Sequence, residues 1–215
     1  MSINDILNNN GIKIDDIIIL ILHGSRTYGR FNENSDWDYV CVVKNEKPAE
    51  SINTENIDVN ILTEKEFDER IVEHDIQTLE NLFCPNIILG TDILKTKCQN
   101  FINSGIDRVK LRTSISRTAS RGLSYSKNLW GSNDYNKSKK NICHAYRYTL
   151  FGLQLIETNK IYDYTCANEF ADRITQTADD GDYKELFKQF LLECKELSKR
   201  LNALCPMIKQ KNKIN

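Results

Sequence analysis

Residues 17–43 read IIILILHGSRTYGRFNENSDWDYVCVV and decide the fold. The apolar run from Ile17 to Leu22 is β-branched and too short for a buried helix, so it predicts a strand covered on both faces. A glycine-serine turn follows at Gly24. Residues 36–43 alternate polar and apolar at first and then become wholly apolar, which predicts a second strand whose first part borders a cleft.

The rest of the chain turns from strand to helix. Residues 57–62 alternate and predict a third strand, with the apolar side chains on one face and Asp58 and Asn60 on the other. A capping-box sequence at residues 63–66 opens a helical region that Pro85 interrupts. Past residue 94 no strand signal remains. We predict an α+β fold with a short first helix at residues 2–10, a first domain of residues 1–94 and a helical bundle domain of residues 95–215, whose helices fall near residues 100–128, 136–158, 166–177 and 183–204.

Composition indicates an ordinary globular protein. The chain has 215 residues, of which 40% are hydrophobic and 27% are charged. No apolar run reaches the roughly 18 residues of a membrane span, so we expect no membrane span and no signal peptide. The seven cysteines are odd in number and form no CxxC pair, which favours reduced thiols in a cytoplasmic compartment.

The net charge of −1 hides an uneven distribution. Residues 108–147 hold ten basic residues and one acid, Asp134, so this stretch carries +9 and the remainder carries −10. Three interpretations fit: a polyanion partner such as RNA, cations presented to a ligand held by the other half, or a solvated helix face. Aromatic residues within this stretch predict either base stacking or packing between helices; they are Tyr125, Trp130 and Tyr135. A stripe of small residues, Ser116, Ser120 and Ser124, predicts a close approach of two helices.

The polar residues around the turn have the chemistry of a phosphate and metal site. Gly24 lets a phosphate approach the backbone without a Cβ, Ser25 adds a hydroxyl donor, and a short helix after the turn would aim its amides at the anion. Asp36 and Asp38 are two residues apart on a strand, so their carboxylates point the same way and repel unless a hard divalent cation neutralises them. Asp58 on a later strand supplies a third carboxylate, or is an exposed acid.

Gly24-Ser25, Asp36-x-Asp38 and Asp58 together resemble the nucleotidyltransferase superfamily of the DNA polymerase β type. Further segments are similar to a bacterial and phage group of predicted nucleotidyltransferases that includes proteins associated with RNA ligases; they are residues 24–29, 35–38 and 75–85 and the spacing Lys140-x-x-x-His144-x-x-Arg147. The resemblance covers about residues 17–160 and is strongest at residues 22–40. It implies a small mixed sheet with flanking helices and dependence on Mg²⁺ or Mn²⁺.

The resemblance also implies an activity, the transfer of a nucleoside monophosphate from a triphosphate such as ATP to a hydroxyl, with release of pyrophosphate. Two metals on Asp36, Asp38 and Asp58 would serve this transfer. We expect the nucleotide to be bound by Gly24, Ser25, Arg26, Lys140, His144 and Arg147, and an RNA end is the favoured acceptor. Arg26 could instead pair with an acid of its own domain, and the helix face of Lys140, His144 and Arg147 could pair with acids of the first half.

Two other functions fit the same motif. A nucleotidyltransferase fold can sense a nucleotide or a partner without transfer, and one half of a toxin–antitoxin pair can adenylylate a protein. The acceptor is not determined by the fold.

Overall fold

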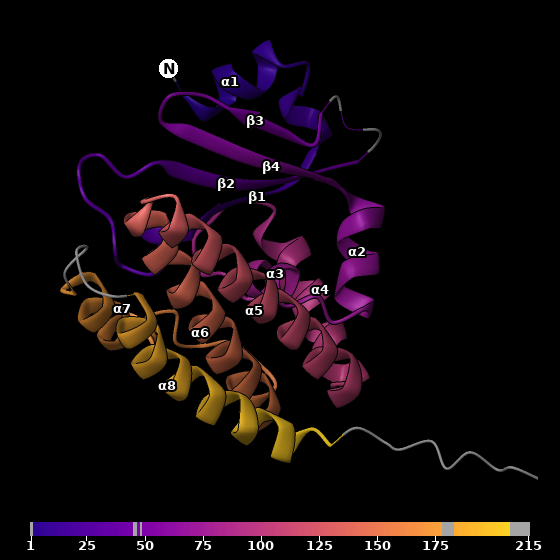
Figure 1. Ribbon diagram of the computed structural model, residues 1–215. Coiled ribbons are helices and arrows are strands. Elements are labelled where there is room, and N and C mark those ends of the chain that lie inside the picture. The colour runs from indigo at the N-terminus through magenta and orange to yellow at the C-terminus, as the bar shows by residue number, and fades with distance from the viewer. Residues whose placement is uncertain (1, 45–46, 48, 178–182, 207–215) are drawn as a thin grey trace, which may run out of the picture. The chain divides into compact units, whose positions relative to one another are not determined.

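The computed structural model describes residues 2–44, 47, 49–177 and 183–206, and it confirms the α+β class (Figure 1). The chain divides into two compact units. The first unit is Met1–Gly105 with Lys160–Thr165, and the second is Ile106–Asn159 with Cys166–Asn215. The predicted boundary after residue 94 falls inside helix α4 (Thr91–Ser104), so the division lies further along the chain, and residues 160–165 return to the first unit.

The first unit contains a mixed sheet of five strands in the order β3-β4-β2-β1-β5. β2 is parallel to β4, whereas the other neighbours are antiparallel. The three predicted strands are confirmed. Two strands of three residues each were missed, because a run so short shows no alternation. The strands are β1 (Ile17–His23), β2 (Trp37–Val43), β3 (Ser51–Asn53), β4 (Ile57–Thr63) and β5 (Ile87–Leu89).

Helices flank both faces of this sheet (Figure 1). On one face α1 (Ile3–Asn9) packs its Ile6 and Leu7 into a core with alternate residues of the strands. The Ser2 hydroxyl caps α1 by accepting from the Asp5 amide. α2 (Glu64–Val72) packs on β4 and β2, α4 packs on β1, and α3 (Ile76–Leu82) lies between them in sequence. β1 and the second half of β2 are therefore buried on both faces, as the apolar run of β1 predicts, whereas alternate residues of β3 and of the first half of β4 are exposed.

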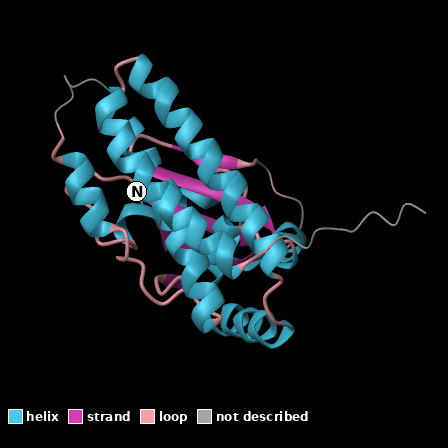
Figure 2. Cartoon of the chain, turned by 60° about the horizontal axis from the view of Figure 1, so that its bottom comes forward, coloured by secondary structure: helices cyan, strands magenta, loops and turns pink. Residues whose placement is uncertain are grey.

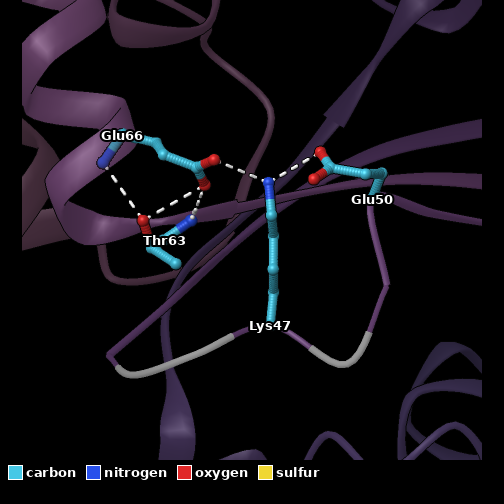
Figure 3. A network of polar contacts seen from close by, with 4 residues as sticks. All are labelled: Lys47, Glu50, Thr63 and Glu66. Atoms are coloured by element: carbon cyan, nitrogen blue, oxygen red, sulfur yellow. Dashed lines mark hydrogen bonds and ion pairs between the residues drawn. The ribbon is translucent and has the colours of Figure 1, made fainter.

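A small ionic network fixes the start of α2 (Figure 3). The Thr63 hydroxyl accepts from the Glu66 amide, and the Glu66 carboxylate accepts from the Thr63 amide, so the predicted capping box is confirmed. Lys47 Nζ lies 2.7 Å from carboxylate oxygens of both Glu50 and Glu66. The Lys47 ammonium and the Thr63 amide hold the pKa of Glu66 at about 2. The network ties the segment that precedes β3 to the helix that follows β4.

The second unit is helical, as predicted (Figure 2). The predicted helix at residues 100–128 is two helices, because the chain takes a positive φ of 77° at Gly105 and the Asp107 side chain caps a new helix. The stripe of Ser116, Ser120 and Ser124 is exposed, so the prediction that it joins two helices is wrong. The helices of this unit are α5 (Arg108–Gly131), α6 (Tyr135–Thr158), α7 (Asn168–Thr175) and α8 (Tyr183–Leu204).

Other small residues let α5 and α6 approach. The hydroxyls of Ser126 and Ser138 are buried and 2.8 Å apart. A Cβ on Gly122 would lie 3.4 Å from the Asn141 carbonyl oxygen. Buried serine and glycine, rather than the exposed serines, therefore set this helix contact.

All seven cysteines are free thiols. Burial raises the pKa of Cys41 and of Cys194 to about 12, which keeps both thiols protonated and poorly nucleophilic. Within the described residues, no helix combines the length and the apolar character that crossing a membrane requires.

Candidate functional site

The glycine-serine turn leaves the end of β1 at the predicted place. Gly24 has a φ of 71°, in the region that favours glycine, and opens a single turn of 3₁₀ helix, η2 (Gly24–Arg26). The amides of Thr27 and Tyr28 donate to the Gly24 carbonyl at 3.0 and 3.2 Å. The predicted short helix is only this turn, so its dipole is small. The groups that can donate hydrogen bonds to an anion are the first amides of the turn and the Ser25 hydroxyl.

Strand register aligns three polar side chains across the sheet. His23 of β1 is the partner of Asp38 in β2, and Asp38 is the partner of Asp58 in β4. Directly paired residues point to the same face, with Cβ atoms about 4.5–5.5 Å apart. Asp38 is half-buried, whereas Asp58 is exposed. The row therefore places two carboxylates side by side at the end of the sheet where the turn begins.

The Asp38 carboxylate lies against the backbone of the turn. A Cβ added to Gly24 would come within 2.1 Å of Asp38 Oδ2 and 2.7 Å of its Cγ. Real Cβ atoms do not approach so closely, so only glycine fits at position 24 while Asp38 holds this position. The turn and the second aspartate of the Asp-x-Asp pair thus belong to one site.

Asp36 lies outside the row that pairs Asp38 with Asp58. It precedes the first residue of β2 and is exposed. Among the described residues, no group of three or more His, Cys, Asp or Glu side chains is arranged to hold a metal ion. The structure brings together Asp38 and Asp58, and the metal role of Asp36, Asp38 and Asp58 stays a prediction.

Arg26 is engaged within its own loop. Its guanidinium stacks 3.6 Å from the centroid of the Trp37 ring and 5.0 Å from that of Phe31, and it donates to the Ser35 carbonyl at 3.0 Å. Trp37 and Asp38 are consecutive on β2, so their side chains leave opposite faces. These contacts favour a role in holding the loop that leads to Asp36 and Asp38. The binding of a phosphate by Arg26 stays a prediction.

A second set of bonds anchors the turn to the segment before β5. Thr27 Oγ1 donates to the Leu22 carbonyl at 2.9 Å and accepts from Asn86 Nδ2 at 3.1 Å. Cys84 Sγ donates to the same carbonyl at 3.4 Å, and burial raises the pKa of Cys84 to about 11, so the thiol keeps the proton that it donates. The end of β1 is therefore fixed by three side chains.

Glu80 is a buried acid beneath the turn that the sequence did not reveal as a site residue. It is 1% exposed, and the Tyr28 hydroxyl donates a short hydrogen bond to its Oε1. The Tyr164 hydroxyl donates to the Glu80 carbonyl at 2.6 Å, and burial raises the pKa of Tyr164 well above its usual value. Oε2 accepts no hydrogen bond from the described residues. The Glu80 side chain thus holds Tyr28, and its backbone carbonyl holds the segment of residues 160–165 that returns to the first unit.

His23 lies in the same row as Asp38 and Asp58. It is half-buried, it pairs with Asp38 in the ladder, and its ring lies edge-on to Tyr28 at 6.4 Å between centroids. Two features of the sequence could have pointed to these residues: His23 directly precedes Gly24, and Glu80 is a carboxylate on the apolar side of a helix. Neither feature identifies a site residue until the strand register and the burial of the helix are known.

The predicted helical residues belong to α6 of the second unit. Lys140 is exposed, His144 is half-buried and stacks with Tyr148 at 6.2 Å between centroids, and Arg147 is 3% exposed. Their decreasing exposure along one helix face shows that they do not share one environment. Nucleotide binding by these three residues stays a prediction.

Several cations of the basic segment have structural partners. Arg108 and Arg112 donate to the carbonyls of Leu204 and Cys205 at the end of α8, each at 3.0 Å. Lys139 is buried and donates to the Thr177 carbonyl at 2.7 Å. Cations that satisfy the last carbonyls of helices stabilise those ends. These three side chains are therefore engaged within the second unit.

The aromatic residues of the basic segment, residues 108–147, differ in burial. Trp130 is buried and packs edge-on against Tyr135 at 4.8 Å between centroids, which confirms helix packing for this pair. Tyr125 is exposed.

No family model and no curated protein matches the chain. Among solved structures, it is similar to the crystal structure of a nucleotidyltransferase-like protein from Exiguobacterium sibiricum, with 10% sequence identity and a TM-score of 0.36 over 94% of this chain and 77% of the other. A likeness at this identity and TM-score does not define an activity.

Proposed function

We propose that this protein is a metal-dependent nucleotidyltransferase that transfers a nucleoside monophosphate from a nucleoside triphosphate to a hydroxyl acceptor. One observation supports it above all: Gly24 approaches Asp38 so closely that a Cβ would meet Oδ2 at 2.1 Å. The turn proposed to bind phosphate and a carboxylate thereby lie in contact. Asp58, paired with Asp38 across the ladder, adds the second carboxylate.

The donor set suits Mg²⁺ or Mn²⁺, since both prefer carboxylate oxygens. Asp38 and Asp58 would hold the cation, and Asp36 would contribute from the residue before β2. When bound, the metal would neutralise the phosphate charge and lower the pKa of the acceptor hydroxyl. Two carboxylates paired across neighbouring strands offer the hard oxygen ligands that such a cation prefers, which is the physical reason to expect one.

Other groups of the protein would bind the triphosphate and accept the proton of the acceptor hydroxyl. The amides of the turn and the Ser25 hydroxyl would bind the triphosphate oxygens. The acceptor oxygen forms a bond to the α-phosphorus while the bond from that phosphorus to the β-phosphate oxygen breaks, and pyrophosphate leaves. Asp58 would accept the proton of the attacking hydroxyl. From the spacing of the motif alone, Lys140, His144 and Arg147 are proposed to contribute to nucleotide binding.

The test is a labelling experiment. The protein is incubated with each α-labelled triphosphate, Mg²⁺ or Mn²⁺, total RNA and lysate proteins, and the fraction that takes up label is identified. We expect label in RNA, together with released pyrophosphate. Label in protein would replace the RNA acceptor by a protein, and nucleotide binding without any transfer would make the protein a sensor.

The first prediction concerns Asp38. The substitution Asp38→Asn keeps the shape but removes the charge beside Gly24, so metal-dependent pyrophosphate release should fall at least about a hundredfold. The circular dichroism spectrum should stay unchanged. Glu55→Gln is the matched control, because Glu55 is an exposed acid three residues before Asp58. Equal turnover in Asp38→Asn and the control would refute the proposed site.

A further inference from the structure

Glu80 of α3 is an acid in the interior of the first unit. It is 1% exposed, and acidic side chains are almost never fully buried unless they are paired. Within the described ranges no cation pairs with its carboxylate, and the hydrogen bond that this carboxylate accepts there comes from the Tyr28 hydroxyl. The burial of this acid is therefore tied to Tyr28.

Tyr28 contacts the glycine-serine turn on both sides of Gly24. Its amide donates to the Gly24 carbonyl at 3.2 Å and so closes the turn. Its ring is 3% exposed and lies edge-on to His23, the residue before Gly24. A Tyr28 ring that is fixed at its hydroxyl by Glu80 therefore restricts the backbone at both ends of the turn.

The Glu80 bond complements the other bonds that hold the turn. Thr27 Oγ1 and Cys84 Sγ both donate to the Leu22 carbonyl, which precedes the turn. The bond between Tyr28 and Glu80 fixes the residue that follows it. Groups that bind a ligand need supports that hold them within about 0.5 Å of the productive geometry. The turn is thus supported before and after Gly24 by different side chains.

We infer that Glu80 is the positioning residue of the glycine-serine turn. Through the Tyr28 hydroxyl it holds the amides of Gly24–Arg26 and the Ser25 hydroxyl in the arrangement that binds a triphosphate. The inference rests on the proposed function, since it takes the turn as the triphosphate site. The property required of residue 80 is a hydrogen-bond acceptor, not a charge: Oε2 accepts no hydrogen bond from the described residues, so an amide group in its place would break none of the bonds described.

The test measures triphosphate binding by isothermal titration of the full chain with inorganic triphosphate and Mg²⁺, together with kcat and KM for pyrophosphate release. Inorganic triphosphate carries no base and therefore reports on the turn. Tyr28→Phe and Glu80→Leu each remove the bond and should raise both the dissociation constant and KM about fivefold. Glu80→Gln keeps the acceptor and should leave both values within about twofold.

The double variant Tyr28→Phe/Glu80→Leu keeps the test decisive if a single variant fails to fold. It replaces both partners by apolar groups, which is nearly neutral for stability when the shapes are similar. Its affinity should equal that of either single variant, because all three lack the same bond.

Tyr164→Phe is the matched control. It removes a hydroxyl that donates to the Glu80 backbone carbonyl, so it lowers stability and leaves the bond to Tyr28 in place. Its dissociation constant and KM should stay within about twofold of the parent values. A loss of folded protein alone lowers the apparent kcat without raising KM, so the control separates stability from positioning.

Four results decide between the inference and the proposed transfer. Parent-like dissociation constant and KM in the double variant would overturn the inference and leave the transfer standing. Weakening by Glu80→Gln equal to that of Glu80→Leu would overturn it too, because a charge would then be required. Triphosphate binding that depends on the Tyr28 bond, without transfer, would leave the inference standing and remove the transfer. No binding of triphosphate and no transfer by the parent protein would overturn both.

Discussion

At the scale of single residues, position 24 joins backbone conformation to site chemistry. Gly24 needs a positive φ of 71°, and its missing Cβ leaves room for Asp38. Gly29 has nearly the same φ, 69°, but a Cβ there would meet no atom within 4 Å. Substitutions at the two glycines therefore distinguish the free-energy cost of a left-handed backbone, which both positions share, from the cost of displacing the Asp38 carboxylate, which only position 24 has.

We predict that Gly24→Ala destabilises the protein more than Gly29→Ala. Both substitutions carry the left-handed penalty of about 1–2 kcal/mol, and Gly24→Ala must also move the Asp38 side chain. Urea unfolding of the two variants measures the difference, and pyrophosphate release should be lost only in Gly24→Ala. Equal stability and equal turnover of the two variants would mean that Asp38 does not hold its position against the turn.

The residue scale also explains which site residues a sequence can reveal. Gly24, Ser25 and the aspartates form a recognisable order along the chain. Glu80 lies far from the turn in sequence and becomes a site residue only because Tyr28 reaches it. No local pattern encodes that meeting.

At the scale of elements, caps and helix contacts carry the local stability. The capping box of α2 is readable from Thr63 to Glu66, but the Lys47 bridge to Glu66 is not, because the partners are nineteen positions apart. Because of this bridge, the stability of the start of α2 depends on pH. The pKa of Glu66 is depressed to about 2 from an ordinary value of 4.5.

We predict that this stabilisation is present above about pH 4.5 and is lost as the pH falls towards 2. The sign follows because the folded state binds the Glu66 proton less readily than the unfolded state. Glu66→Gln keeps an acceptor for the cap and removes the charge, so it should cost up to about 1 kcal/mol at neutral pH, as the partly exposed pair is screened by water. The gap to the parent should close as the pH falls.

Chemical denaturation at several pH values measures this gap. Glu69→Gln is the control, since its pair with Lys65 is exposed on both sides and is worth little at any pH. A gap for Glu66→Gln that is constant from pH 7 to pH 2 would contradict the ionic origin.

We predict that Gly152→Ala destabilises the helical unit. A Cβ at Gly152 of α6 would lie 2.1 Å from Ile115 Cδ1 of α5 and 3.5 Å from Leu201 Cδ1 of α8. Crowding of this kind costs about 1–3 kcal/mol, which exceeds the roughly 0.5–1 kcal/mol that alanine contributes within a helix. Thermal unfolding followed by circular dichroism checks it. Gly131→Ala, where the Cβ would meet no atom within 4 Å, should be neutral or stabilising, and the opposite order would refute close packing at Gly152.

At the scale of the whole molecule, the first unit is not a continuous stretch of chain. Residues 160–165 return to it from between α6 and α7, and Tyr164 donates to the Glu80 carbonyl. The first unit is therefore incomplete until the chain has passed α6. A boundary drawn where strand signals end, after residue 94, missed both α4 and this return.

We predict that Tyr164→Phe lowers the free energy of unfolding by about 1–2 kcal/mol, because the buried Glu80 carbonyl loses a donor. Tyr135→Phe is the control: it removes the same atom, but its bond to Asn133 is exposed, so the change should be within about 0.5 kcal/mol. Urea titration of both variants measures the two values. An equal effect would show that the return segment adds nothing to the first unit.

The sequence by itself determined the three longer strands, the α2 cap, the helical second half and the order Gly24, Asp38, Asp58, because periodicity, capping and motif spacing are local properties of the chain. Only the tertiary structure decided the rest: the two short strands, the register that aligns Asp38 with Asp58, the burial of Glu80 and the division of the basic residues between helix ends and exposed positions. Those features depend on which distant segments meet, and the free energy of such a meeting comes from burial and register that no single segment contains.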